Sequence, residues 1–273
     1  MFKIEHLSAG TPSYPAHLLD LVDPPAALKL KGAALEWSGP RLAIVGARRA
    51  SAEGCRLAQS LAHELSESSV LIISGGARGI DAAAHRGAVE AARPTWVVLP
   101  TTVERPVPLG NRGLFGEVLS QGGALLADAE VAPGKLPFLR RNRLIAALAD
   151  FVLVVEAEVE SGTRHTVEAA RSLGRPFGFW SWPPGDPRGL AARSPWSLGG
   201  VECPDRSALR VRLGLDPPAS PADPLLLALN EGPLTVDQLA RALAQPVNLV
   251  LSRLFELELA GRVEARGGRY APT

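Results

Sequence analysis

This sequence contains few cysteines and has almost no net charge. Only two of its 273 residues are cysteine, Cys55 and Cys203, and their wide separation matches neither a disulfide framework nor a metal-binding spacing. The formal net charge is +1, so the chain as a whole is not attracted to nucleic acid or to a membrane surface. A site for a polyanion must therefore be a local concentration of positive charge.

Long hydrophobic runs are missing as well. No uninterrupted apolar stretch is long enough to cross a bilayer, and residues 1–6 are not followed by the apolar core of a signal peptide. We therefore expect a soluble, cytoplasmic protein with no membrane partner. The lack of a disulfide framework is in keeping with a reducing compartment.

From residue 41 onward, short apolar segments alternate with helical ones. Strands are predicted at 42–45, 70–74, 95–99, 124–127, 151–155 and near 176–180. Helices are predicted over 52–66, 80–92, 138–149 and 163–173, and near 112–121. This alternation predicts the α/β class, with a doubly wound, mostly parallel Rossmann-like sheet at residues 41–216 and helices on both of its faces. Residues 1–40 contain several prolines and are expected to be a lead-in packed on this domain, without long helices.

The C-terminal part of the chain has a different pattern. Residues 181–216 are rich in proline and glycine and predict irregular structure, and residues 217–222 predict a linker. In residues 223–273, helices are predicted at 225–229, from a cap at Thr235 through 243, and at 247–259. A hairpin with a Gly-Gly turn is predicted at 262–270. Three helices followed by a hairpin are typical of a winged-helix domain.

The most informative segment is a glycine-rich turn between a predicted strand and a predicted helix, Ser74-Gly75-Gly76-Ala77-Arg78-Gly79-Ile80-Asp81. Glycines let a ligand approach the backbone, and the free amides at a helix start favour an anion. Arg78 adds a guanidinium, whose shape suits phosphate. The alternative is an ordinary tight connection, since glycine turns are common in α/β proteins. Phosphate binding is the favoured hypothesis.

Two nucleotide-binding motifs are absent. Gly46 is followed by Ala47 and Arg48, which breaks the G-x-G-x-x-G spacing, and the second strand ends in Ser74 and Gly75 without the acidic residue that would bind a ribose. The P-loop pattern G-x-x-x-x-G-K-[ST] does not occur. These absences argue against a dinucleotide and against a P-loop nucleoside triphosphatase, and we predict no cofactor.

Other predicted loops carry similar chemistry. The carboxyl ends of parallel strands meet at one edge of a sheet, so the residues that follow them are expected to lie together. Their Arg, Gly, Ser and Thr residues can hold phosphates. An aromatic ring among arginines is typical of single-strand binding, although a solvated helix start is the alternative for residues 135–143. The residues expected at this site are Gly46, Arg48, Arg49, Ser51, Gly75, Gly76, Ala77, Arg78, Phe138, Arg140, Arg141, Asn142, Arg143, Ser161, Gly162 and Thr163.

Neither a catalytic set nor a metal site is predicted. Asp81 and His85 lie one helical turn apart and could form an acid–base pair. A helix-capping aspartate and a histidine ordered by its neighbours are favoured instead. Ser161, Thr163 and Thr166 have no base paired with them by local sequence.

Several motifs together resemble the DNA-processing protein A family, also called Smf, over nearly the whole chain. Residues 44–48 are similar to its IVGxR motif, and residues 74–85 to SGGARGIDxxAH. Residues 138–145 resemble F-P-x-R-N-R-I-I, and residues 154–163 resemble VVEA…SG. The chain departs from the family pattern at Leu139, at Ala127 and Asp128, and at residues 180–184.

This resemblance implies a homodimeric protein without enzymatic activity that binds single-stranded DNA. The family protects incoming DNA and helps to load the RecA recombinase in natural transformation and recombination. By resemblance, Arg48 and Arg78 would contact DNA phosphates, and Gly75, Gly76 and Ala77 would supply backbone donors. The resemblance also implies that Phe138, Asn142 and Arg143 line the same pocket.

The winged-helix region is expected to bind duplex DNA weakly or not at all. From residue 223 onward, the sequence has five arginines (241, 253, 262, 266 and 269) and six acidic residues (223, 231, 237, 256, 258 and 264). Its third helix begins at 246–248 with no basic residue, whereas a groove-reading helix normally needs Arg or Lys for phosphates. A protein-contact role is therefore favoured.

Two other functions are alternatives. One is a nucleotide-processing enzyme of the lysine-decarboxylase-like phosphoribohydrolase type, because Gly162 and Thr163 with Glu168 resemble part of its G-G-x-G-T-x-x-E motif. The preceding residues, Glu160 and Ser161, lack the second glycine of that motif, which weighs against the enzyme. The other is a transcription regulator that acts through the winged helix, which the charge balance disfavours.

Overall fold

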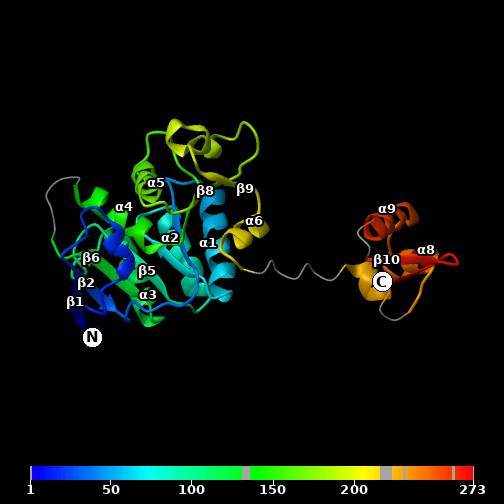
Figure 1. Cartoon of the computed structure of the whole chain (residues 1–273), viewed down its shortest axis with the longest axis horizontal. Coiled ribbons are helices and arrows are strands. Elements are labelled where there is room, and N and C mark those ends of the chain that lie inside the picture. The colour runs from blue at the N-terminus through cyan, green and yellow to red at the C-terminus, as the bar shows by residue number, and fades with distance from the viewer. Residues whose placement is uncertain (1, 131–135, 216–222, 230–231, 260–261, 273) are drawn as a thin grey trace. The chain divides into compact units, whose positions relative to one another are not determined.

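The computed structural model describes residues 2–130, 136–215, 223–229, 232–259 and 262–272. It divides into two compact units, Met1–Leu215 and Asp216–Thr273 (Figure 1). The predicted linker at 217–222 lies outside the described residues, and so does Lys135.

The first unit is built on a nine-stranded sheet with the order β1-β2-β6-β5-β4-β3-β7-β8-β9. Seven of these strands run parallel to one another. Their bounds are β3 Arg41–Val45, β4 Leu71–Ser74, β5 Thr95–Leu99, β6 Ala124–Asp128, β7 Phe151–Val154, β8 Phe177–Trp180 and β9 Val201–Cys203. The structure thus confirms the predicted doubly wound, mostly parallel sheet.

The strand order reverses between β3 and β7. The chain adds β4, β5 and β6 on one side of β3, then returns to place β7, β8 and β9 on the other side. The loops that follow β3 and β7 therefore leave the sheet in opposite directions and open a crevice between them. In sheets of this kind, ligands bind at such a crevice.

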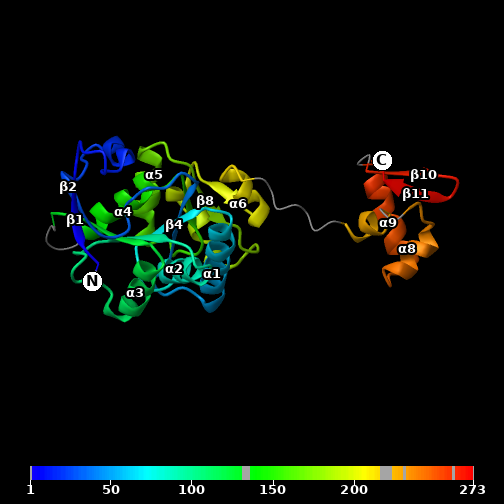
Figure 2. The ribbon, with the colours of Figure 1, turned by 90° about the horizontal axis from the view of Figure 1, so that it is seen from below.

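Helices cover both faces of the sheet. Helices α1 (Ala52–Glu67), α2 (Ile80–Glu90) and α3 (Arg112–Ser120) lie on one face, and α4 (Leu136–Leu148) and α5 (Thr163–Ser172) lie on the other (Figure 2). Along β3, Leu42 and Ile44 pack in the core beneath α1, while Ala43 and Val45 pack in the core that contains α4 residues. Both faces of the central strands are therefore buried, which explains their continuous apolar sequences.

The lead-in adds two antiparallel strands to the sheet. Strand β1 (Ile4–Ser8) pairs with β2 (Ala27–Gly32), and β2 pairs antiparallel with β6. The one helical turn between β1 and β2 is a short 3₁₀ helix, Ala16–Asp20. Leu7, Leu18 and Leu28 are buried in the same core as α4.

The prediction of irregular structure at 181–216 is wrong in part. After three short 3₁₀ turns, Val201–Cys203 forms β9 and extends the sheet beside β8, and Arg206–Arg212 forms α6. Asp205 caps α6 by accepting from the amide of Ala208 at 2.8 Å. A three-residue strand and a seven-residue helix are too short to show a hydrophobic period in the sequence. The strand forms because it pairs with β8.

The second unit is a winged helix with its own core. It contains α7 (Pro224–Leu229), α8 (Val236–Ala242), α9 (Val247–Leu259) and the hairpin of β10 (Val263–Arg266) with β11 (Arg269–Pro272). Thr235 and Gln238 form a capping box at the start of α8. Its buried core residues include Leu225, Leu229, Leu239, Val250 and Leu254. Within the described parts of both units, no helix combines the length and apolar character needed to cross a membrane.

Candidate functional site

A cleft of about 550 Å³ opens where the strand order reverses. The loops after β3, β4 and β7 and the first turns of α4 form its walls. The residues that line it are Val45, Gly46, Ala47, Arg48, Arg49, Ala77, Asp81, Phe138, Leu139, Arg141, Asn142, Glu158, Glu160, Ser161, Gly162, Thr163, His165 and Thr166.

The structure brings together ten of the residues expected at this site. Those lining the cleft are Gly46, Arg48, Arg49, Ala77, Phe138, Arg141, Asn142, Ser161, Gly162 and Thr163. The other six do not line it. They are Ser51, Gly75, Gly76, Arg78, Arg140 and Arg143.

A buried ion pair forms the floor of the cleft. Nη1 of Arg141 lies 3.6 Å from Oδ2 of Asp81, and the two residues are only 6% and 4% exposed. Burial raises the pKa of the Asp81 carboxyl, although Arg141 and the amide of Ala77 act in the opposite direction. The Ala77 amide donates to Oδ2 of Asp81 at 3.4 Å. One donor of the glycine-rich turn thus binds the protein's own carboxylate. The prediction of a helix-capping aspartate is wrong, because Gly79 is the N-cap of α2 and Asp81 lies within the first turn, where it pairs with Arg141.

The ion pair between Arg141 and Asp81 also explains why residue 75 is a glycine. A Cβ at this position would overlap the guanidinium of Arg141, so only glycine lets Arg141 lie across the turn and reach Asp81. Gly75 and Gly76 are both buried. The predicted DNA contacts of these two glycines stay predictions, and the structure gives both a packing role.

Two arginines on the loop after β3 are exposed at the mouth of the cleft. Arg48 and Arg49 both line it. The guanidinium carbon of Arg48 lies 5.0 Å from the ring centroid of Phe138, at the start of α4, within range of a cation–π interaction. The loop after β3 and the first turn of α4 therefore meet across the cleft. Arg78 is also exposed, on the turn beside Ala77.

The helical period of α4 divides the arginines of the predicted basic run. Arg141 points inward to Asp81, whereas Arg140 lies 3.7 Å from Asp128 and Arg143 lies 3.4 Å from Asp23. Consecutive helical positions face different directions, so a run that is continuous in sequence is not one surface. Contacts of Arg140 and Arg143 with DNA stay predictions.

The loop after β7 is fastened to α4 and to itself. Asn142 donates through Nδ2 to the carbonyl of Gly162 at 3.1 Å. The hydroxyl of Ser161 donates to Oγ1 of Thr163 at 3.0 Å and accepts from the Thr163 amide at 3.2 Å. These bonds fix the wall that faces Arg48 and Arg49.

The expected site left out eight residues that line the cleft, and three of them, Glu158, Glu160 and His165, are titratable residues that follow β7. They belong to the loop after β7 and to the start of α5, which already supplied three expected residues. Their position after a parallel strand was the available signal. The two glutamates are exposed at the mouth of the cleft and add negative charge to it.

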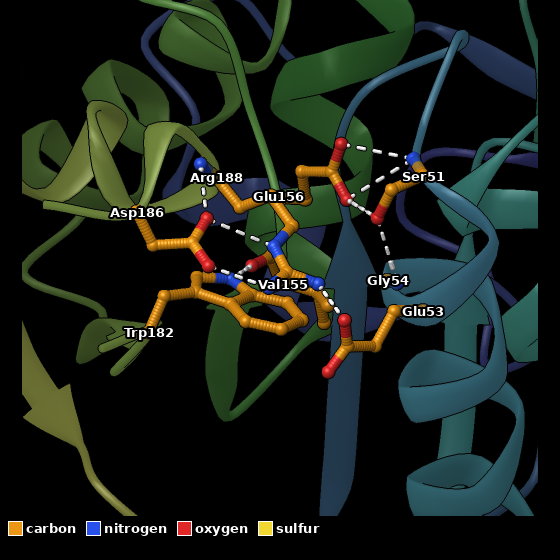
Figure 3. Close-up of polar contacts among 8 residues, drawn as sticks. All are labelled: Ser51, Glu53, Gly54, Val155, Glu156, Trp182, Asp186 and Arg188. Carbon is orange, nitrogen blue, oxygen red and sulfur yellow. Dashed lines mark hydrogen bonds and ion pairs between the residues drawn. The ribbon is translucent and has the colours of Figure 1, made fainter.

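Ser51 lies outside the cleft but is bonded to the loop after β7. Its amide donates to Oε1 of Glu156 at 3.0 Å, and its hydroxyl donates to Oε2 at 2.6 Å (Figure 3). The same hydroxyl accepts from the amide of Gly54 at 3.0 Å, so Ser51 is the N-cap of α1.

His85 is a structural residue of the core, as the sequence favoured. It is fully buried, and its Nδ1 lies 2.9 Å from Oγ1 of Thr95. The Thr95 hydroxyl donates to the carbonyl of Ile72 at 2.6 Å, so the Nδ1–H of a neutral His85 must be the donor to Thr95. In the described parts of the chain, no group of three or more His, Cys, Asp or Glu side chains could hold a metal ion.

Comparison with known proteins places this fold in a family. The sequence model of the DNA recombination-mediator protein A family matches residues 5–192, and that of the DprA winged helix domain matches residues 213–269. The chain belongs to this family. It is also 32% identical to protein Smf of Escherichia coli over 97% of its own length and 76% of that protein. The resemblance stated from the motifs is thereby confirmed.

Two solved structures of this family share the fold. The DNA processing protein A of Streptococcus pneumoniae has a TM-score of 0.68 at 28% identity, over 77% of this chain and 74% of that one. The DNA processing protein A of Helicobacter pylori, described in its single-stranded DNA binding mode, has a TM-score of 0.61 at 27% identity. That match covers 69% of this chain and 86% of the other.

Proposed function

We propose that this chain binds single-stranded DNA in the cleft between the β3 and β7 loops. The observation that carries the proposal is the pair of exposed arginines, Arg48 and Arg49, at the mouth of that cleft. Guanidinium groups contact phosphates without regard to base sequence. The chain's net charge of +1 cannot attract DNA by itself, so binding depends on these local charges.

The cleft has a wall and a floor suited to an unpaired strand. Phe138 offers an aromatic ring for stacking with a base. Asn142 and the Ser161–Thr163 segment add polar groups that are already fixed by hydrogen bonds, so little ordering is required on binding. The single-stranded DNA binding mode described for the Helicobacter pylori relative supports the same function here.

We further propose that this role is one of binding and not of catalysis. Ser161 and Thr163 hydrogen-bond to each other, and Nδ1 of His165 faces Glu168 at 3.2 Å. Within the described residues, no hydrogen bond pairs either hydroxyl with His165 or another base. A nucleophile without an adjacent base is not activated. Homodimer formation, protection of incoming DNA and loading of the RecA recombinase in natural transformation are proposed from family membership.

The winged helix fits a protein contact better than a DNA groove. On α9, Val247, Leu251 and Phe255 recur every four residues and are 43%, 45% and 62% exposed. The only arginine of α9, Arg253, is bonded to Asp223 and Glu256. An exposed apolar stripe with its arginine already paired does not suit phosphate contacts, so we propose weak or no duplex binding.

The test measures affinity for a labelled oligothymidylate and for a duplex of equal length at several salt concentrations. Arg48→Ala and Arg49→Ala are each expected to weaken single-strand binding, and to reduce the slope of log K against log salt by about 0.7 per lost phosphate contact. Arg78→Ala is expected to have a smaller effect, because Arg78 does not line the cleft. Arg93→Ala is the matched control, since Arg93 is exposed but precedes β5 at the opposite edge of the sheet.

Equal or tighter binding to duplex would contradict the proposal. So would an unchanged salt slope in the Arg48 and Arg49 variants. Release of free base from nucleoside monophosphates by the purified protein would favour the phosphoribohydrolase instead.

A further inference from the structure

The loop that carries Arg48 and Arg49 is held at both ends by one residue, Glu156. At its start, the Ala47 amide donates to the backbone carbonyl of Glu156 at 2.7 Å. At its end, the amide and hydroxyl of Ser51 donate to the carboxylate of Glu156. The two arginines lie between these anchors. Glu156 itself follows β7, the strand beside β3.

The carboxylate fills the anion-binding end of α1. The first amides of a helix have no partners in the helix and carry partial positive charge. Ser51 caps one of these amides, that of Gly54, and the Glu156 carboxylate accepts from both the amide and the hydroxyl of Ser51. A Cβ on Gly54 would overlap Oε2 of Glu156. The start of α1 thus leaves a space that the Glu156 side chain occupies.

A second set of contacts, made by Trp182 and Arg188, holds the backbone next to Glu156. The indole of Trp182 donates through Nε1 to the carbonyl of Val155 at 2.6 Å. The guanidinium of Arg188 lies 3.9 Å from the Trp182 ring centroid and pairs with Asp186 and with Glu53, in the first turn of α1 (Figure 3). The Trp182 bond therefore anchors the backbone at the residue before Glu156.

We propose that Glu156 is a positioning residue for DNA binding, which holds Arg48 and Arg49 at the mouth of the cleft. This inference rests on the proposed single-strand binding. It predicts that removal of the Glu156 carboxylate weakens DNA binding, whereas simple electrostatics predicts stronger binding. Removing a negative charge near a polyanion site strengthens binding if the charge acts only through its field, whereas loss of the loop anchor weakens binding.

The first measurement does not involve DNA. Trypsin cleaves after arginine, and the exposed Arg48 and Arg49 are protected only as far as their loop is held. In Glu156→Ala, cleavage after Arg48 and Arg49, followed by mass spectrometry, is expected to accelerate about tenfold. Cleavage after Arg164, an exposed arginine on α5, is expected to be unchanged and reports any global unfolding.

The second measurement uses the oligothymidylate. Glu156→Ala is expected to weaken binding about three- to tenfold, and to flatten the salt dependence as the arginine variants do. In an Arg48→Ala/Arg49→Ala background, it is expected to change affinity less than about twofold, because residues that act as one unit are not additive. Glu117→Gln, an exposed carboxylate on α3 that does not line the cleft, is the charge control.

Ser51→Ala provides a milder variant in case Glu156→Ala fails to fold. It removes the hydroxyl bond to Glu156 and the hydroxyl's cap on the Gly54 amide, and it keeps the bond from the residue 51 amide to Glu156, so intermediate acceleration of cleavage is expected. Unchanged cleavage after Arg48 and Arg49 in both variants would overturn the loop-holding role. Tighter DNA binding, or full additivity with the arginine substitutions, would overturn positioning. If the parent protein fails to bind the oligonucleotide, the proposed function fails, and the protease result still decides whether Glu156 holds the loop.

Discussion

His85 illustrates how one buried side chain can control the stability of the central sheet. Burial lowers the pKa of His85 to about 3, against an ordinary value of 6.5. Below pH 6.5 the unfolded chain takes up a proton at this position, whereas the folded protein does not. The unfolded state therefore binds more protons, and the free energy of unfolding falls as the pH is lowered from 6.5 toward 3.

The first prediction follows from this difference. Between pH 6 and pH 4, His85 is expected to lower the free energy of unfolding by about 1.4 kcal/mol per pH unit. Denaturant unfolding at several pH values measures it, and His85→Gln, whose amide can still donate to Thr95, is expected to remove that part of the slope. Asp81, whose pKa burial raises, contributes with the opposite sign and is common to both proteins, so the difference between them isolates His85.

His63→Gln provides the control for the loss of any histidine, because His63 is partly exposed on α1. If the free energy of unfolding of His85→Gln changed with pH as steeply as that of the wild type, protonation of His85 would not be the cause of the lower stability in acid.

At the scale of the element, the start of α1 is the point where local and long-range structure meet. Ser51 is a cap that the sequence could suggest, because serine before a helical segment is a common start signal. Its partner Glu156 lies 105 residues further along the chain. Gly54 completes the arrangement by leaving space for the carboxylate. The cap of α1 at Ser51 is therefore local, whereas the contact between Ser51 and Glu156 is tertiary.

The second prediction concerns Gly54. Gly54→Ala is expected to displace the Glu156 carboxylate and to lower the free energy of unfolding by about 1–3 kcal/mol, even though alanine is the better helix former. Gly116→Ala on the exposed face of α3 has nothing within 4 Å of the added Cβ. It is expected to raise the free energy of unfolding by about 0.5–1 kcal/mol. Thermal or urea unfolding measures the free energy of unfolding of the two variants. Equal gains in stability would mean that the Glu156 carboxylate does not occupy the space beside Gly54.

At the scale of the whole molecule, the two units have separate cores. The buried clusters of the first unit contain only residues up to Leu213, and the cluster of the second begins at Leu225. All of the residues that line the cleft belong to the first unit. Removal of the second unit therefore leaves every described wall of the cleft in place.

The third prediction is that a protein ending at Leu215 keeps single-strand binding. Its affinity for oligothymidylate and its salt slope are expected to match those of the full chain within about twofold, since no phosphate contact is lost. Fluorescence anisotropy with both proteins measures this, with circular dichroism to establish folding. A large loss of affinity in a folded truncated protein would place part of the DNA site on the winged helix.

The amino-acid sequence by itself determined the order and type of the main elements. Strand and helix periods marked the alternation from β3 to β8, and the cap at Thr235 and the Gly267-Gly268 turn marked the winged helix. Motifs in the loops after β3, β4 and β7 indicated which residues would gather, because parallel strands bring such loops to one edge. These features are local, or follow from the order of elements, so residue patterns encode them.

Only the tertiary structure decided which charged groups face the cleft and which face each other. The basic run on α4 divides among Asp81, Asp128 and Asp23. The glycine-rich turn makes room for Arg141, and the Glu156 carboxylate binds Ser51. Each pairing joins segments that are distant in sequence and become neighbours only through strand order and helix rotation. Burial then fixes them, because a charge removed from water must find a partner.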